Sequence, residues 1–122
     1  MALTAPAEHR DCRAASHVLN RVGDKWTVLV VMMLRQRPHR FNDLKRAIGG
    51  ISQQMLTRTL KALERDGMVH RTVHPSVPPQ VEYSLSELGH SLAEPVRRLG
   101  EWAFAHIAVI EEHQARYDRA GA

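Results

Sequence analysis

Six side chains between residues 52 and 61 have the chemistry that nucleic-acid binding requires. They are Ser52, Gln53, Gln54, Thr57, Arg58 and Lys61. In a helix, which turns about 100° per residue, these groups should lie opposite the apolar residues Leu56, Leu60 and Leu63. None of them is an acid, and Glu64 and Asp66 are expected outside the arc, whereas solvated helix faces usually mix acids with bases. Such a face is typical of a helix that bonds base edges and phosphates. A solvated face that happens to lack acids is the alternative.

The neighbouring residues position this face by marking the ends of its helix. Ser52 is a favourable N-cap, and Ile51 and Leu56 have the spacing of a hydrophobic staple. Gly67 suits the left-handed position that ends a helix. Just upstream, Gly49-Gly50 follows a second helical pattern, whose apolar residues are Phe41, Leu44 and Ile48. Two helices joined by a short glycine-containing turn predict a helix-turn-helix, although other helical hairpins share the pattern.

A β-hairpin is predicted directly after this helix. Residues 68–74 and 80–85 favour strands with alternating apolar side chains, and three prolines stiffen the tip between them. A hairpin in this position is expected to be a wing that contacts the DNA backbone or minor groove. The candidate contacts from the wing and its flank are Arg40, Arg71, His74 and Ser76. The alternative is a hairpin that only closes the edge of the core.

Positive charge is concentrated around these elements. The 122-residue chain has a formal net charge of +4, yet residues 35–71 contain nine Lys or Arg and three Asp or Glu, a local charge of +6. Such a patch is the electrostatic footprint expected of a nucleic-acid-binding surface. The length fits one domain, which we expect over residues 12–117 between a flexible N-terminal arm at 1–11 and a flexible tail at 118–122.

The remaining apolar residues predict a core helix and a subunit interface. A short helix should end at Gly23, and Asp24 should cap the next, whose expected core residues are Trp26, Leu29, Val30 and Met33. A long helix should follow Ser86 and be kinked or divided at Pro95. Beyond Pro95, apolar side chains cover more than one face, which favours burial by a second subunit over burial within the monomer. The candidate dimer residues are Leu99, Trp102, Ala103, Ile107 and Ile110.

The order of these motifs resembles the HxlR family of bacterial winged helix-turn-helix transcriptional regulators. The matching pieces are Cys12, Gly23-Asp24-Lys25-Trp26-Thr27, Arg40-Phe41-Asn42-Asp43-Leu44, Gly50-Ile51-Ser52 with Met55-Leu56, Leu63-Glu64-Arg65-Asp66-Gly67, Val77-Pro78-Pro79-Gln80-Val81-Glu82-Tyr83 with Leu85, and Glu87-Leu88-Gly89. The resemblance implies a mainly α fold with a small β-hairpin wing, dimerised through N- and C-terminal helices. It also implies a homodimer on a pseudo-palindromic operator in double-stranded DNA, with the six polar residues on the recognition helix.

Cys12 occupies the position at which some members of that family sense oxidants or electrophiles. Here Arg13 follows it, where a proline is frequent in relatives. Basic neighbours such as His9 and His17 favour a reactive thiol, whereas Asp11 opposes it. A redox sensor and a passive thiol both remain open. A metal site at His9, Cys12 and His17 is disfavoured, because a fourth ligand and a recognised zinc spacing are lacking.

The other motifs disfavour an enzyme and a membrane protein. The sequence contains no phosphate-binding glycine loop, no HExxH motif and no nucleophile with a matching base, so we expect no catalytic residue, metal or cofactor. A single cysteine and the lack of a signal-peptide or membrane-length apolar run favour a cytoplasmic protein. We therefore expect a sequence-specific DNA-binding transcriptional regulator that acts as a repressor rather than an activator, and the sequence does not indicate a small-molecule effector. The alternative is a winged-helix interaction module whose basic face binds an acidic partner.

Overall fold

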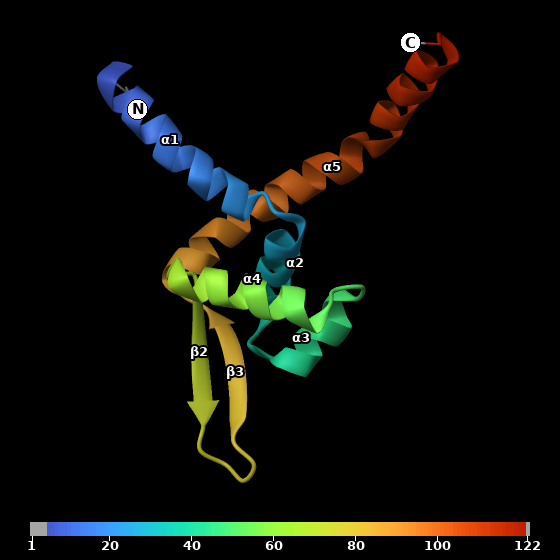
Figure 1. Cartoon of the computed structure of the whole chain (residues 1–122). Coiled ribbons are helices and arrows are strands. Elements are labelled where there is room, and N and C mark those ends of the chain that lie inside the picture. The colour runs from blue at the N-terminus through green and yellow to red at the C-terminus, as the bar shows by residue number, and fades with distance from the viewer. Residues whose placement is uncertain (1–4, 122) are drawn as a thin grey trace.

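The computed structural model describes the backbone of residues 5–121 and the side chains of residues 12–121. Its elements follow the order α1 (Ala5–Val22), α2 (Lys25–Gln36), β1 (His39–Arg40), α3 (Phe41–Ile48), α4 (Gln53–Arg65), β2 (Val69–His74), β3 (Gln80–Leu85) and α5 (Glu87–Arg119). Helices α2, α3 and α4 gather at the centre, and the β2–β3 hairpin projects from them (Figure 1). The outer ends of α1 and α5 diverge from this body in the same view. The mainly α winged helix-turn-helix predicted from the sequence is confirmed.

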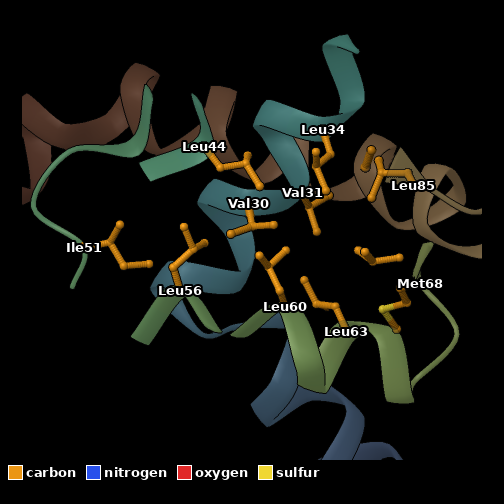
Figure 2. Packing of buried hydrophobic residues seen from close by; sticks show 12 residues of the cluster. Val30, Val31, Leu34, Leu44, Ile51, Leu56, Leu60, Leu63, Met68 and Leu85 are labelled. Atoms are coloured by element: carbon orange, nitrogen blue, oxygen red, sulfur yellow. The ribbon is translucent and has the colours of Figure 1, made fainter. Parts of the chain in front are cut away.

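The core lies between α2 and the two helices of the helix-turn-helix. Its fully buried side chains are Val30, Val31 and Leu34 of α2, Leu44 of α3, and Leu56, Leu60 and Leu63 of α4. Figure 2 shows the α4 leucines pointing toward the α2 residues. The predicted apolar arc of α4 is therefore confirmed. Val30 is confirmed as a core residue of α2, whereas Trp26, Leu29 and Met33 are only partly buried, because the buried side of α2 is formed by Thr27, Val30, Val31 and Leu34.

A three-stranded antiparallel sheet in the order β1-β3-β2 supports the hairpin. Val69 pairs with Leu85 at the base of the hairpin and His74 pairs with Gln80 near its tip. The sequence did not predict β1, since two residues are too few to show a strand's alternation. Its pairing of His39 with Tyr83 ties the chain before α3 to the wing, so the wing is joined to the helix-turn-helix by backbone pairing.

Both terminal helices are longer than the sequence predicted. The expected arm over residues 1–11 is already helical from Ala5, so helix α1 begins before Cys12, and residues 1–4 lie outside the described residues. Helix α5 is continuous through Pro95 and ends at Arg119, so Pro95 does not divide it. A proline removes one backbone donor, here the helical partner of the carbonyl group of Ser91, and Ser91 is an exposed residue.

Candidate nucleic-acid interface

Five of the six predicted side chains lie along one strip of helix α4, in which all but the half-buried Thr57 are exposed. Gln53, Gln54, Thr57, Arg58 and Lys61 line a shallow hollow on the surface. Ser52, the sixth, is the N-cap, and its Oγ accepts a hydrogen bond from the Met55 amide at 3.0 Å. The cap satisfies a donor at the helix start that would otherwise lack a partner. The strip therefore starts at a defined helix end, with its side chains free to meet a ligand.

The other side of α4 fixes the orientation of this strip. Ile51 and Leu56, which flank the N-cap, are both buried and lie near each other in Figure 2, as the staple spacing predicted. The helix ends in a Schellman motif, in which the Met68 amide donates to Leu63 O at 2.9 Å and the Gly67 amide to Glu64 O at 3.1 Å. Gly67 has φ +78°, the left-handed conformation that the sequence predicted. Rigid packing along one side thus holds the polar strip outward.

Glu64 lies on this face of α4, so the expectation that it would lie outside the polar arc is wrong. Glu64 is exposed and follows Lys61 by three residues, a spacing that puts it on the same side of the helix. The carboxylate-free surface is therefore the N-terminal part of α4, from Gln53 to Lys61, and not the whole helix. In helix-turn-helix proteins the N-terminal residues of the second helix are the ones that reach base edges. The acid thus lies at the end of α4 where base contacts are least expected.

A second polar hollow lies on α3, and the sequence analysis missed it. Asn42, Lys45 and Arg46 line it, and all three are exposed. Arg46 also forms an ion pair with Asp43 on the same helix. The sequence could have predicted this group, because residues at positions i, i+3 and i+4 of a helix share a face. These residues extend the positive charge from α4 onto the neighbouring helix.

The wing does not bring its predicted contacts together. Directly paired residues of antiparallel strands share a face, and successive residues alternate between the two faces. Arg40 pairs with Glu82 and His74 with Gln80, so both lie on one face, whereas Arg71 pairs with Tyr83 on the other. All three side chains are exposed, and His74 Nε2 lies 3.4 Å from Glu82 Oε1. A ligand that lies against one face of the sheet can therefore contact either Arg40 and His74 together or Arg71 alone.

Ser76, the last predicted contact, is already hydrogen-bonded within the tip of the wing. Its Oγ donates to Pro78 O at 2.7 Å, across the turn that joins the two strands. The side chain is exposed, but its only hydroxyl proton is already used. Ser76 is therefore placed to shape the tip, and a contact to a phosphate, which needs a donor, would require this bond to break.

The predicted dimer residues have no cover within the described chain. Leu99, Trp102, Ala103, Ile107 and Ile110 are all exposed, as is every other described residue from 101 to 121. Helix α1 adds Val18 and Leu19, which are also exposed. The alternative of a helix buried all round within the monomer is therefore wrong. On the same helix, Arg97 binds both Glu94 and Glu101, and its hydrogen bond lowers the pKa of Glu94 and raises the pKa of Arg97.

Cys12 lies on α1 with an exposed free thiol. Within the described part of the chain, no three His, Cys, Asp or Glu side chains gather as metal ligands would. The side chain of His9, the third member of the set considered from the sequence, lies outside the described residues. None of the described helices is long and apolar enough to cross a membrane.

Comparison with known proteins identifies the family. The model of the HxlR-like helix-turn-helix family matches residues 21–111. The chain belongs to this family. Its members are helix-turn-helix transcriptional regulators, and this chain shares 49% identity over 85 residues with YtfH of Escherichia coli (strain K12), an uncharacterized HTH-type transcriptional regulator. That alignment covers 70% of this chain and 68% of the relative.

Solved structures of other regulators share the fold. The transcriptional regulator ytfH from Salmonella typhimurium superposes with a TM-score of 0.77 at 40% identity, covering 83% of this chain and 90% of that one. The redox regulator HypR in its reduced form superposes with a TM-score of 0.75 at 38% identity, covering 81% and 98%. The chain is accordingly a transcriptional regulator with a winged helix-turn-helix fold.

Proposed function

We propose that this regulator is a homodimeric repressor that binds a pseudo-palindromic operator in double-stranded DNA. The observation that carries the proposal is the exposed N-terminal strip of α4, where amide, hydroxyl and cationic groups occur together without an acid. Arg bonds guanine and Gln bonds adenine through two hydrogen bonds each, which is how the major groove is read. We assign the recognition contacts to Ser52, Gln53, Gln54, Thr57, Arg58 and Lys61.

The neighbouring elements supply the contacts that do not depend on sequence. Arg40 and His74 lie on one face of the sheet and Arg71 lies on the other. The phosphate backbone of a duplex held against α4 should therefore contact either Arg40 and His74 or Arg71. Ser76 shapes the tip between the strands. Phosphate contacts of this kind fix the register of a protein on DNA, while base contacts carry the sequence information.

Dimerisation supplies the symmetry of the operator. The uncovered residues Leu99, Trp102, Ala103, Ile107 and Ile110 on α5, with the apolar side chains of α1, form the proposed interface. A two-fold axis between identical subunits presents two copies of α4 to DNA, so the half-sites should lie about one helical turn, ~10 base pairs, or a multiple of it apart. A dimer bound over a promoter then represses by blocking access of the polymerase.

Cys12 is the proposed point of control. The thiol is exposed on α1, the helix that also carries Val18 and Leu19 of the proposed interface, and the redox regulator HypR shares the fold. In the step we propose, the Cys12 thiols of two subunits lose two protons and two electrons to an oxidant such as diamide, which is reduced to its hydrazine, and a disulfide joins the subunits. The change in α1 geometry then alters the grip on DNA.

A titration of two labelled duplexes tests the central proposal. One duplex carries the region upstream of the gene for this protein and the other has a random sequence, and both are measured at physiological salt. We expect the upstream duplex to bind at least ~1000-fold more tightly. Equal weak binding to both would reject the repressor and favour the alternative, an interaction module whose basic face binds an acidic protein partner.

A further inference from the structure

The three residues that follow α4, namely Asp66, Gly67 and Met68, are held from two sides by elements distant in the sequence. We call them the α4 turn. Within the turn, the Schellman hydrogen bonds satisfy the amides of Gly67 and Met68. Three acceptors remain that point to other elements: the Asp66 carboxylate and the carbonyl oxygens of Gly67 and Met68. Each of the three is bound by a residue of α1 or of the start of α5.

Helix α1 holds the first acceptor. Arg21 Nε donates to Asp66 Oδ2 at 3.0 Å, across 45 positions of sequence. In the described part of the chain, no other hydrogen bond between two side chains joins different helices. The pair is partly shielded, with side-chain exposures of 39% for Arg21 and 27% for Asp66. A single directional contact therefore links the last turn of α1 to the end of the recognition helix.

The start of α5 holds the other two acceptors. Ser86 donates through its Oγ to Gly67 O at 2.6 Å and through its amide to Met68 O at 2.9 Å. The same Oγ accepts the Gly89 amide at 3.1 Å and so caps α5. A Cβ at Gly89 would lie 2.2 Å from Met68 O, so only glycine allows α5 to start this close to the turn. The Ser86 hydroxyl thus donates its single proton to the α4 turn and accepts the amide of Gly89 with a lone pair.

These contacts connect the proposed dimer interface to the proposed recognition helix. Helices α1 and α5 carry the uncovered apolar residues, and both reach α4 at the same three-residue turn. We infer that Arg21, Ser86 and Gly89 are positioning residues, which act together with the packing of α4 on α2 to set the angle of α4 relative to the dimer axis and thereby the half-site spacing that the dimer accepts. The inference rests on the proposed function and adds the residues through which dimer geometry reaches the DNA.

Two properties of DNA binding should respond differently when the α4 turn is loosened, namely contact with one half-site and simultaneous binding of both half-sites. Contacts of one α4 with one half-site depend on the side chains of its polar strip. Binding of both half-sites at once depends on the distance and angle between the two α4 helices, so loosening the turn should affect only the second property. A residue that merely stabilised the fold would reduce both in proportion.

The test uses the full-length protein and duplexes whose half-site spacing varies by one base pair at a time. Arg21→Met removes the bond to Asp66 and keeps the length of the side chain. Ser86→Asp keeps a cap for α5 but has no proton to donate to Gly67 O. Arg13→Met, at an exposed residue of α1 with the same charge, is the matched control. The charge exchange Arg21→Asp with Asp66→Arg tests for rescue.

We expect both turn variants to dimerise and to bind a single half-site as the unaltered protein does. They should lose about tenfold in affinity at the preferred spacing, ~1.4 kcal/mol, and accept neighbouring spacings more equally. The control should match the unaltered protein, and the charge exchange should restore the preference. Unchanged spacing profiles, or equal losses of affinity for half-site and operator, would overturn the inference and leave the proposed function intact. If the unaltered protein does not distinguish operator from random DNA, the proposed function itself falls.

Discussion

The indole of Trp102 stacks on the imidazole of His106 along the uncovered side of α5. Their ring centroids are 4.5 Å apart and the planes differ by 22°, and His106 Nδ1 lies 2.7 Å from the Trp102 carbonyl oxygen. The stack holds a large apolar side chain in one orientation although 54% of it is exposed. A side chain that is ordered before association loses less entropy on binding. Trp102 is therefore the residue of α5 best prepared to be an anchor of the dimer.

Trp102→Ala should weaken the dimer more than any other single truncation on α5. Buried tryptophans at interface centres contribute about 2 kcal/mol or more, which corresponds to at least ~30-fold in the dissociation constant. Phe104→Ala is the control, because Phe104 is 85% exposed and lies roughly 200° around the helix from Trp102. Sedimentation velocity over a range of protein concentrations measures the dissociation constant. A loss for Trp102→Ala no larger than that for Phe104→Ala would mean that Trp102 is not the anchor of the dimer.

Arg58→Ala and Lys61→Ala should weaken DNA binding in different ways. If Arg58 bonds a base edge, its loss costs ~1 to 3 kcal/mol at one position of the operator and relaxes specificity there. Gln54→Ala should behave similarly at another position. Lys61, if it holds a phosphate, should lower the affinity for all sequences and reduce the salt slope by about one.

Competition binding against a set of operators with single base changes, repeated at several salt concentrations, distinguishes these outcomes. The same uniform loss on every sequence for all three substitutions would remove base readout from α4.

Ser52→Ala should destabilise the protein without changing its core. The substitution leaves the Met55 amide without the acceptor that now lies at 3.0 Å, and a lost N-cap costs about 1 kcal/mol. Ser52→Asp keeps an acceptor at the helix start and should remain close to the original stability. Urea unfolding followed by circular dichroism gives both free energies of unfolding. A loss as large for Asp as for Ala would mean that the hydroxyl acts through something other than the cap.

The sequence predicted the helix-turn-helix because each of its signals is local. The N-cap Ser52, the glycine at 67 and the leucines of α4 act within a few residues of each other, and all three were confirmed. The bond between Arg21 and Asp66 spans 45 residues and leaves no periodic signal. The same holds for the separation of Arg40 from Arg71, which follows only from the register of β1, β2 and β3. Helical spacing alone places Glu64 on the polar face of α4, so the prediction that it lies outside that face was wrong.

The pKa of Glu94 should lie below its ordinary value in the folded protein. Its hydrogen bond with Arg97 is the main cause, since it favours the charged carboxylate. The stabilising contribution of such a lowered pKa is present above the unfolded-state pKa and is lost as the pH falls through the folded-state pKa. A carboxyl-carbon NMR titration measures it, and Arg97→Gln should raise the pKa of Glu94. Arg116→Gln, which disturbs the Glu112 pair on the same helix, should leave it unchanged.

Diamide should join two chains through Cys12 if the α1 helices meet in the dimer. A disulfide requires the two Cα atoms to come within about 7 Å, so its formation would report that Cys12 lies close to the two-fold axis. The band at twice the chain mass on a non-reducing gel should vanish with dithiothreitol and be absent from Cys12→Ser, because the chain has one cysteine. Operator affinity should change with the same dose of diamide. An unlinked chain with unchanged affinity, and with no small thiol attached by mass spectrometry, would leave Cys12 a passive residue of α1.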